Sequence, residues 1–461
     1  MISPATAPLS NADLIARYDG RVPRYTSYPT APHFHPGVGG EIYAAWLADL
    51  AADTTLSLYL HVPFCDRLCL YCGCNTGVMR REAPKRAYAA HLLREIDMVA
   101  GLIGRRAAVS HVHWGGGTPT ALPPDCLIGI MDHIRARFAL APDAEIAIEI
   151  DPTSLSADCL GALGRMGVNR ASVGVQDFDA AVQAAIGRRQ SLAETATAMR
   201  GLRALGIASI NLDLIYGLPH QTEASVIRTA RQTLGLGAER AAVFGYAHVP
   251  WMKKHQALIP EASLPDAAAR MGQEAAIRRV LEEEGGFLPV GLDHFARPTD
   301  AMAKALREGG LRRCFQGYTT DAAPVLIGLG ASAIGCLPQG YVQNAPTATA
   351  YAAAIKDGAF ATVRGVALTR DDRLRRAVIE RIMCGETVHL ASLAAAHGIG
   401  ATDLLRDAEA LAGCAADGLV EWDGLTLAVT PRGRPFVRNI AAVFDAYLKR
   451  PMAAPRHARA I

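Results

Sequence analysis

The chain has 461 residues, of which 50% are apolar and 20% charged, so it can form two or three domains with large cores, and disorder as the main state is excluded. Its 47 basic and 44 acidic residues leave a net charge of only +3, which argues against a surface that coats nucleic acid or is strongly attracted to membranes. No run reaches the length of a membrane span and residues 1–20 have no signal-peptide layout, so we expect a cytoplasmic protein without membrane insertion.

Residues 1–53 are expected to form an N-terminal arm. The arm is rich in proline and tyrosine, as in RVPRYTSYPTAPHFHP at 21–36, and a short helix candidate follows at 41–52. A segment of this kind has no core of its own and must pack on another part of the chain. We therefore expect it to act as a lid over a neighbouring site.

Residues 54–360 alternate short apolar runs with amphipathic helical segments. This alternation, together with 43 glycines and only 6% aromatic residues, is typical of βα units around a parallel sheet. Six such units favour the α/β class and a partial (β/α)6 barrel with an extension, in which chemistry lies at the carboxyl ends of the strands. A long helix is expected at 264–284. The expected strands are 56–62, 109–114, 145–150, 170–175, 208–216 and 241–246.

Residues 361–461 are expected to form a small, mostly helical C-terminal domain. Its helical segments are followed by LVEWDGLTLAVT at 419–430, which predicts a hairpin with a DG turn, so the domain resembles a winged-helix module. From Asp417 to the end of the chain, seven Lys and Arg residues stand against four Asp and Glu residues. This surplus is too small and too spread out to indicate a nucleic-acid partner.

Ten cysteines in a chain from a reducing compartment do not indicate a disulfide framework. Six of them lie singly, and we interpret them as small buried apolar residues: Cys126, Cys159, Cys314, Cys336, Cys384 and Cys414. The other four fall within ten residues, directly after the first expected strand: Cys65, Cys69, Cys72 and Cys74.

Two kinds of metal centre fit this cysteine loop. The CxxxCxxC spacing of Cys65, Cys69 and Cys72 suits a 4Fe–4S cluster, in which the fourth iron stays open for a small molecule. With Cys74 as a fourth ligand, the loop could instead hold a structural zinc ion. Structural zinc sites generally join two short hooks, whereas these cysteines share one loop and no second hook follows. The cluster is therefore favoured.

This loop after the first strand of a partial barrel resembles the radical S-adenosylmethionine superfamily. Within it, the chain is similar to the oxygen-independent coproporphyrinogen III oxidase family over nearly its whole length. Cys74 and the N-terminal arm motif separate it from the related haem-chaperone branch. The resembling stretches are PRYTSYPTA (23–31), SLYLHVPFCDRLCLYCGCN (57–75), HWGGGTPT (113–120), IEIDP (148–152), GVQDF (174–178), NLDLIYGLP (211–219), DHFARP (293–298), FQGYTT (315–320) and ALTRDD (367–372).

The resemblance implies a role for each candidate site residue. Cys65, Cys69 and Cys72 would hold the cluster, Tyr71 would place an aromatic ring over it, and Cys74 would act in catalysis. Guanidinium groups suit the propionates of the substrate, and Arg24 and Arg297 are the candidates. Two S-adenosylmethionine molecules are implied, the first contacted by Tyr59, Gly116, Gly117, Thr118, Glu149, Ala247 and Ile334, the second by Gln176, Arg188 and Asp213.

Two of these assignments have plainer alternatives. Glycines at the end of a strand let a ligand approach the backbone, but they also make an ordinary βα turn. A lone carboxylate at a strand end, such as Glu149, is more often a cap or an ion-pair partner than a ligand contact. The resemblance favours the ligand-binding interpretation in both cases.

The activity that the resemblance implies is the oxidative decarboxylation of coproporphyrinogen III to protoporphyrinogen IX in oxygen-independent haem biosynthesis. A small reducing protein such as flavodoxin or ferredoxin would supply an electron, and a 5'-deoxyadenosyl radical from S-adenosylmethionine would take hydrogen from the propionates on rings A and B, which become vinyl groups. We expect a monomer. A haem chaperone and a haem-degrading radical enzyme of the same fold are the alternatives.

Overall fold

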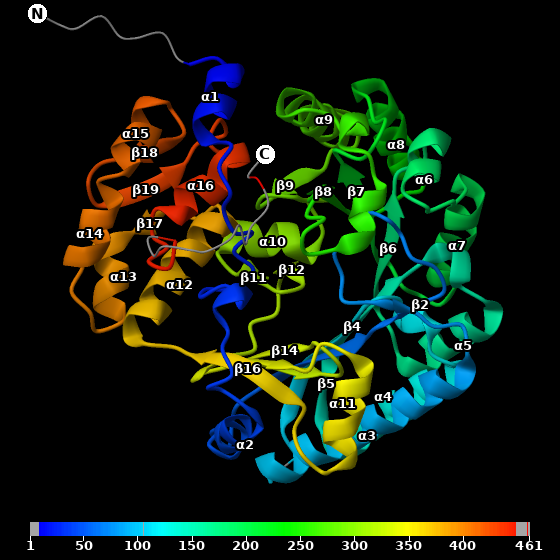
Figure 1. Cartoon of the computed structure of the whole chain (residues 1–461). Coiled ribbons are helices and arrows are strands. Elements are labelled where there is room, and N and C mark those ends of the chain that lie inside the picture. Colours follow the sequence, from blue (N-terminus) through cyan, green and yellow to red (C-terminus); the bar gives the residue numbers. More distant parts are fainter. Residues whose placement is uncertain (1–8, 105, 449–458, 460–461) are drawn as a thin grey trace, which may run out of the picture.

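A twelve-stranded sheet forms the centre of the chain (Figure 1). The computed structural model describes residues 9–104, 106–448 and 459. Within them the strand order is β16-β15-β14-β13-β1-β4-β5-β6-β7-β8-β10-β9. The six strands from β1 to β8 in this order are parallel, and all six expected strands are confirmed. They are β1 (Leu56–Val62), β4 (Ala108–Gly116), β5 (Ala139–Ile150), β6 (Arg170–Gln176), β7 (Ser209–Tyr216) and β8 (Arg240–Gly245).

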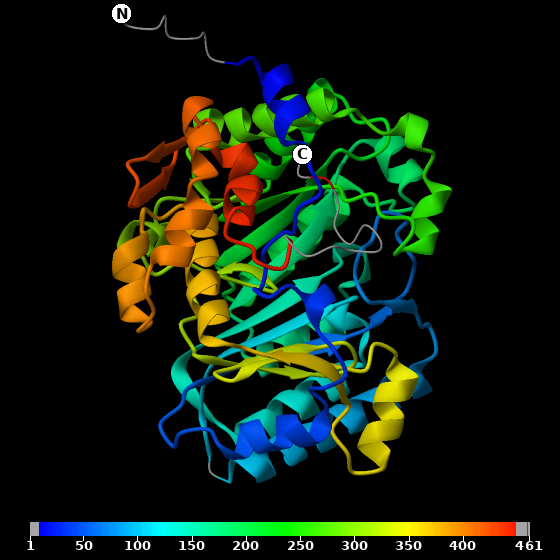
Figure 2. The same ribbon diagram turned by 60° about the vertical axis from the view of Figure 1, so that its left-hand side comes forward.

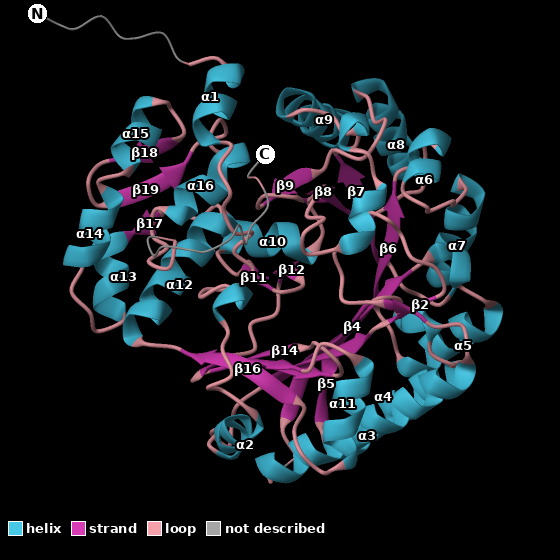
Figure 3. Cartoon of the chain, in the orientation of Figure 1, coloured by secondary structure: helices cyan, strands magenta, loops and turns pink. Residues whose placement is uncertain are grey.

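Helices connect these strands and cover the outer side of the sheet, as Figure 3 shows. Their apolar faces form one continuous core with the strands; Leu92 and Ile96, one helical turn apart, are fully buried against it. The expected partial (β/α)6 barrel is therefore confirmed. The helices are α3 (Glu82–Ile103), α4 (Pro124–Arg137), α5 (Ala157–Met166), α6 (Ala180–Ala185), α7 (Leu192–Ala204) and α8 (Glu223–Gly235).

Further strands extend the barrel at both edges. β16 lies beyond the expected domain boundary at residue 361 and pairs with β15, so the sheet ends at Ala367. The expected helix at 264–284 consists of α9 (Ala267–Arg279) and a π-helical turn, Val280–Glu284. The edge strands are β13 (Val325–Leu329), β14 (Ile334–Leu337), β15 (Gly340–Asn344), β16 (Thr362–Ala367), β9 (Leu288–Val290) and β10 (His294–Ala296), and the connecting elements are α10 (Ala301–Glu308), β11 (Arg312–Cys314), β12 (Gly317–Thr319) and α11 (Ala348–Lys356).

The N-terminal arm contains α1 (Asn11–Tyr18) and α2 (Gly40–Ala48). The helix candidate at 41–52 is confirmed as α2, whereas α1 was not expected. Leu14, Tyr25 and Tyr28 of the arm are buried in the core of the C-terminal domain. Figure 2 shows the arm, in dark blue, running between the orange helices and the green strands. The arm therefore packs on the rest of the chain, as its composition predicts.

Helices and a small sheet, β17-β19-β18, form the C-terminal domain. The expected hairpin is confirmed, because Asp423 in its turn accepts hydrogen bonds from the backbone amides of Leu425 and Thr426. No helix of the described part of the chain is long and apolar enough to cross a membrane. The elements are α12 (Arg370–Cys384), β17 (Val388–His389), α13 (Leu390–Ala396), α14 (Thr402–Ala408), α15 (Leu411–Ala416), β18 (Val420–Trp422), β19 (Thr426–Val429) and α16 (Val437–Ala442).

The six single cysteines follow the expectation only in part. Cys159, Cys384 and Cys414 are buried, as expected for small apolar residues. The other three, Cys126, Cys314 and Cys336, are only half-buried, so the expectation is wrong for them.

Candidate active site

A cavity of about 920 Å³ lies at the carboxyl ends of the parallel strands. This volume is typical of a site for one or more small molecules. The barrel therefore gathers the predicted residues at the edge where its architecture places chemistry. Those that line the cavity are Cys65, Cys69, Tyr71, Cys72, Cys74, Gly116, Gly117, Thr118, Glu149, Gln176, Arg188, Asp213, Ala247 and Arg24.

The cysteine loop lies between two short parallel strands, β2 (Phe64–Cys65) and β3 (Gly77–Val78). The Thr118 hydroxyl lies 3.7 Å from the Cys65 thiol, and the Arg188 guanidinium lies 3.6 Å from the Cys69 thiol. The Leu70 amide donates a hydrogen bond of 2.9 Å to the carbonyl oxygen of Ile186. The protein itself therefore fixes this loop over the strand ends.

Residues 249–258 hold the loop from its other side. Lys253 Nζ donates to the carbonyl oxygen of Cys74 over 2.8 Å, and Gln256 Nε2 donates to that of Tyr71 over 2.9 Å. Nε2 of His255 lies 2.8 Å from the carbonyl oxygen of Cys72. The sequence analysis did not identify these anchors, because they come from a loop almost two hundred residues away along the chain.

The thiols suit an iron–sulfur centre. A hydrogen bond from the Cys74 thiol lowers the pKa of Cys72, and the same bond raises the pKa of Cys74. Thiolates are the ligands of iron–sulfur clusters. No three His, Cys, Asp or Glu side chains of the described residues are close enough together to hold a single metal ion. Cys65, Cys69 and Cys72 instead line one cavity, and they fit the thiolate set of a 4Fe–4S cluster.

Gly117 allows β4 to approach the cysteine loop closely. A Cβ atom at this position would lie 2.7 Å from the carbonyl oxygen of Phe64 and 3.0 Å from the Cys65 thiol. The Gly117 amide also donates to the carbonyl oxygen of Val62 over 2.8 Å. Because backbone atoms block one side, a larger residue at 117 must displace Cys65 or the end of β4.

The substitution Gly117→Ala should therefore reduce cluster binding. We expect less than half of the wild-type iron per chain after anaerobic reconstitution, and a loss of unfolding free energy of about 1–3 kcal/mol from overpacking. Gly73→Ala is the matched control, because a Cβ atom there meets no atom within 4 Å. Iron analysis and thermal denaturation check both variants. Full iron content in Gly117→Ala would show that cluster binding does not depend on the close approach of β4 to the cysteine loop.

Glu149 faces the cavity from the end of β5. Its carboxylate accepts a hydrogen bond of 3.1 Å from the Gly116 amide and lies 3.3 Å from Nε2 of His113. Gly116 has a φ of +115°, and a Cβ atom there would lie 2.7 Å from the His61 ring. The turn thus requires glycine and holds the carboxylate in place. Such a carboxylate can accept hydrogen bonds from the hydroxyls of a ribose.

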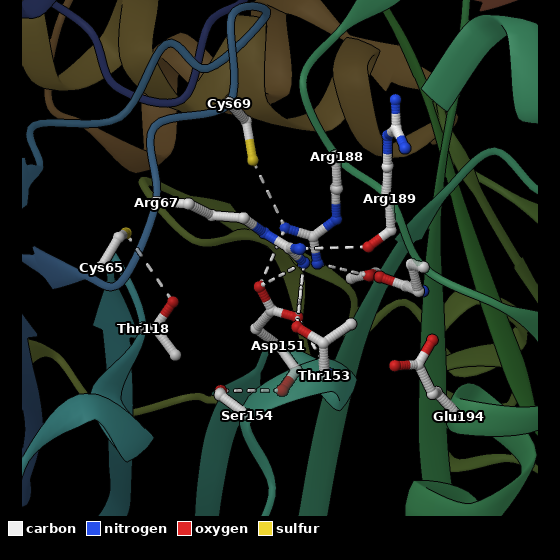
Figure 4. A network of polar contacts seen from close by, with 12 residues as sticks. Cys65, Arg67, Cys69, Thr118, Asp151, Thr153, Ser154, Arg188, Arg189 and Glu194 are labelled. Atoms are coloured by element: carbon white, nitrogen blue, oxygen red, sulfur yellow. Dashed lines mark hydrogen bonds and ion pairs between the residues drawn. The ribbon is translucent and has the colours of Figure 1, made fainter. Parts of the chain in front are cut away.

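An ion-pair network lies beneath the loop (Figure 4). Asp151 is 3.3 Å from the guanidinium groups of both Arg67 and Arg188. Burial favours the neutral carboxyl, but the charges of Arg188 and Arg67 outweigh it and lower the pKa of Asp151. Arg188 also donates to the carbonyl oxygen of Gly174 over 2.7 Å, while its Nε is buried without a hydrogen-bond partner among the described residues. Arg188 is therefore held in place with one donor left for a ligand.

Two further predicted residues, Gln176 and Asp213, also line the cavity. Gln176 ends β6 with a φ of +70°, a strained backbone conformation that is often found at functional sites. Asp213 on β7 accepts hydrogen bonds from Ser172 Oγ over 2.9 Å and from Asn211 Nδ2 over 2.7 Å. Burial and the charge of Glu149 raise the pKa of Asp213 to about 6. Asp213 can therefore change its protonation near neutral pH.

Two residues predicted to contact S-adenosylmethionine are not part of the cavity wall. The Tyr59 hydroxyl lies 3.1 Å from Nδ1 of His61, and its ring lies behind Gly115. Ile334 begins β14 and packs near Phe34 in a separate apolar cluster. Neither residue is among those that line the cavity, and their contact with the cofactor stays a prediction.

The structure places Arg297, predicted to bind substrate, outside the lining of both cavities at the strand ends. Because β10 is antiparallel to β8, it carries the chain back to the amino-terminal end of β8, where the Arg297 amide donates to the carbonyl oxygen of Glu239. The guanidinium lies 4.9 Å over the Phe287 ring and donates to the carbonyl oxygen of Gly285 over 3.1 Å. Arg297 therefore packs at the amino-terminal ends of the parallel strands, on the side opposite the cavity.

A second cavity of about 550 Å³ adjoins the first. The two share Arg24, Ala247 and the segment 244–246 as a common wall. Residues of the arm, of α9 and of the C-terminal domain also line it. Its wall combines arginines with aromatic rings: Arg21, Arg24, Arg270, Arg278, Arg438, Arg459, Tyr216, Phe244, Tyr246 and Trp251. The sequence analysis identified only Arg24 among these.

Comparisons with known proteins agree with this geometry. Residues 59–233 match the family model of the radical SAM superfamily, and residues 368–436 match that of the HemN C-terminal domain. The partial barrel and its cysteine-lined cavity thus define a radical SAM protein, a class that uses a 4Fe–4S cluster and S-adenosylmethionine.

Similarity to named relatives extends over the whole chain. The chain is 52% identical to the oxygen-independent coproporphyrinogen III oxidase of Bradyrhizobium diazoefficiens, over 95% of this chain and 97% of the relative, and 39% identical to that of Salmonella typhimurium, over 97% and 98%. The solved structure of the coproporphyrinogen III oxidase HemN from Escherichia coli, a radical SAM enzyme, is 37% identical with a TM-score of 0.89, covering 95% of this chain and 99% of that one. The chain belongs to the oxygen-independent coproporphyrinogen III oxidase family.

Proposed function

We propose that the chain catalyses the oxygen-independent oxidative decarboxylation of coproporphyrinogen III to protoporphyrinogen IX, a step of haem biosynthesis. The propionates on rings A and B each lose one hydrogen atom from the β-carbon, carbon dioxide and one electron, and each becomes a vinyl group. The electron passes to an external acceptor. The names of the relatives and the matching C-terminal domain support this activity.

The observation that carries the proposal is the pair of adjoining cavities. One is lined by the thiols and the strand-end polar residues, and suits the cofactors. The other is lined by arginines and aromatic rings, and suits a macrocycle with four propionates. Because the two share a wall, a tetrapyrrole in the second cavity can direct one propionate toward the first. Each decarboxylation then takes place at the boundary between them.

Six arginines line the second cavity, together with five carboxylates: Asp19, Glu261, Asp266, Glu274 and Asp293. Burial lowers the pKa of Arg24, and the nearby Arg313 and Arg270 act in the same direction, against the opposite effect of Asp293. Burial and the charge of Arg24 lower the pKa of Arg438 to about 10. Nε of Arg270 is buried without a hydrogen-bond partner among the described residues. Carboxylate ligands would stabilise the charged form of these buried guanidinium groups, so Arg24 and Arg270 are our candidates for propionate binding.

The chain's own residues position the reactants and exclude water. Cys65, Cys69 and Cys72 hold the cluster, and Glu149 with the Gly116 turn holds S-adenosylmethionine. When bound, these cofactors supply the 5'-deoxyadenosyl radical that removes the hydrogen atom. Arg24 lies on the arm and faces both cavities, so the arm closes the site as a lid.

A second S-adenosylmethionine is part of the proposal, with Arg188 as its clearest partner. The free Nε of Arg188 suits the methionine carboxylate. Arg188→Ala should weaken binding at one of two sites about tenfold or more and leave the iron content unchanged. Arg67→Ala is the matched control, because it removes the other arginine bound to Asp151 and should leave both sites intact. Equilibrium dialysis that finds one site in the unmodified protein would exclude the second molecule.

The remaining features of the proposal concern the surroundings of the chain. A flavodoxin or ferredoxin supplies the electron, and the enzyme acts as a cytoplasmic monomer.

The arm spans 1–53, the barrel with its extension follows, and we place the start of the helical domain after Ala367. The pairing of β16 and the match of residues 368–436 to the C-terminal domain model support this boundary.

Anaerobic turnover tests the proposed activity. The protein is reconstituted with iron and sulfide, incubated with coproporphyrinogen III, S-adenosylmethionine and a reductant, and the porphyrins are separated by chromatography. We expect a monovinyl intermediate followed by protoporphyrinogen IX. A parallel incubation with haem should leave the haem intact. Consumption of haem would indicate the haem-degrading alternative, and binding of haem without turnover of either compound would indicate the chaperone.

A further inference from the structure

The cysteine loop has an outer side as well as the side that faces the active site. A hollow of about 270 Å³ lies on this outer side and adjoins the large cavity. Leu68, Cys72, Cys74 and Thr76 line both the hollow and the large cavity, so the loop forms the wall between them. The hollow is lined by Leu68, Cys72, Cys74, Asn75, Thr76, Gly77, Val78, Met252, Lys253, Lys254 and His255.

Exposed apolar side chains surround this hollow. Leu68, Val78 and Met252 are 40%, 47% and 57% exposed, although large apolar side chains are usually buried. They come from the cysteine loop, from β3 and from the 249–258 segment, and the fold brings them to one place. Clustered apolar side chains with a polar rim are typical of a protein-binding surface, and methionine suits a partner that docks transiently.

The hollow is lined by basic side chains and by no acidic ones. Lys253, Lys254 and His255 are among its lining residues, and no Asp or Glu of the described residues is. Asp66 of the cysteine loop pairs with Lys85 at 3.3 Å. A partner that fits this surface must therefore carry acidic groups around an apolar contact.

The rim of the hollow is connected directly to the cofactor loop. Lys253 and His255 hydrogen-bond the carbonyl oxygens of Cys74 and Cys72, and both side chains also line the hollow. A protein bound here therefore contacts the residues that hold the loop, and no other layer of the chain intervenes. This is the position required for transfer of an electron into the loop from outside.

We propose that this hollow, with the exposed side chains Leu68, Val78, Met252 and Lys254, is the docking surface for an acidic one-electron carrier protein. The carrier gives one electron to the cluster and leaves oxidised by one electron, and no bond is made or broken in this step. The inference rests on the proposed function only because that reaction begins with a one-electron reduction. It adds the place on the chain where the electron enters.

Binding and reduction of the reconstituted full-length protein test this surface. An oxidised flavodoxin and, separately, an oxidised ferredoxin are titrated at low ionic strength by calorimetry. Lys254→Glu should weaken carrier binding about fivefold or more, and Met252→Asp/Lys254→Glu about tenfold or more. Lys304→Glu on α10 is the control, an exposed lysine that lies in none of the three cavities, and should bind as the unmodified protein does.

A second measurement separates docking from damage to the loop. Reduction of the cluster by the reduced carrier, followed by absorbance, should slow by a similar factor in both variants, whereas reduction by dithionite should not change. If Lys254→Glu loses iron, Lys254→Gln and Met252→Asp carry the same comparison.

Three results would overturn the proposal. The first is equal carrier affinity in all variants, and the second is no binding of either carrier to the unmodified protein. The third is that the substitutions weaken binding to anionic phospholipid vesicles but not binding to the carriers. None of these measurements needs porphyrinogen turnover, so a negative result differs from failure of the proposed activity.

Discussion

Each of the single substitutions Cys65→Ala, Cys69→Ala and Cys72→Ala should remove the iron centre almost completely. Three thiolates from one loop line the cavity, and loss of one leaves an iron without a protein ligand. We expect each variant to retain less than a tenth of the roughly four irons per chain that a full cluster contains, and to lose all turnover. Iron analysis after anaerobic reconstitution, with the absorption spectrum, gives the result.

Cys74→Ser is the matched control in the same loop. Cys74 lines the cavity, but the cluster needs its fourth iron open for S-adenosylmethionine. This variant should keep its iron and still cleave S-adenosylmethionine, while product formation slows or stops, as expected if Cys74 acts in catalysis. Equal loss of iron in all four variants would favour four thiolate ligands instead.

Arg24→Ala and Arg270→Ala should each raise the KM for coproporphyrinogen III about tenfold or more. The two guanidinium groups line the second cavity, and each charge-assisted hydrogen bond to a propionate contributes about 1.5–3 kcal/mol. Cleavage of S-adenosylmethionine without substrate should not change in Arg270→Ala, because Arg270 lines only the second cavity, whereas Arg24 also faces the cofactor cavity. Steady-state kinetics with varied porphyrinogen, together with 5'-deoxyadenosine measured by chromatography, separates the two effects.

Arg297→Ala serves as the control for these variants. Its guanidinium stacks on Phe287 at the other end of the sheet, so its removal should leave the KM near the wild-type value even if some stability is lost. A tenfold rise in KM for Arg297→Ala, with normal values for Arg24→Ala and Arg270→Ala, would place the propionates elsewhere.

The barrel could be predicted because each of its strands carries apolar side chains that are buried in the core, at nearly every position in β1 and at alternate positions in β7. β1 is apolar over nearly its whole length and its burial matches that pattern, so periodicity and flanking turns indicated it directly. β5 begins at Ala139, before the expected start at 145, because this part pairs with β4 through its backbone while its side chains, mostly half-buried or exposed, show no alternation. α1 was missed because it is short and buries only Leu14.

The candidate site was predictable where it lies within one loop or at a strand end. The cysteine loop, Gly117 and Glu149 belong to local motifs, and the parallel sheet brings them to one edge. The position of Arg297 away from the cavities could not be predicted, because its motif does not show that β10 returns to the amino-terminal ends of the parallel strands. The second cavity could be predicted only at Arg24, because Arg24, Arg270 and Arg438 come from three segments that meet only in the folded chain.

The most direct test of the proposed reaction follows one hydrogen atom. Coproporphyrinogen III carrying deuterium at the β-carbons of its propionates is incubated anaerobically with the reconstituted protein, and the 5'-deoxyadenosine is analysed by mass spectrometry. If the account is correct, each vinyl group formed is accompanied by one 5'-deoxyadenosine that contains one deuterium atom. Vinyl product accompanied by unlabelled 5'-deoxyadenosine, or labelled substrate that remains unchanged while S-adenosylmethionine is consumed, would contradict it.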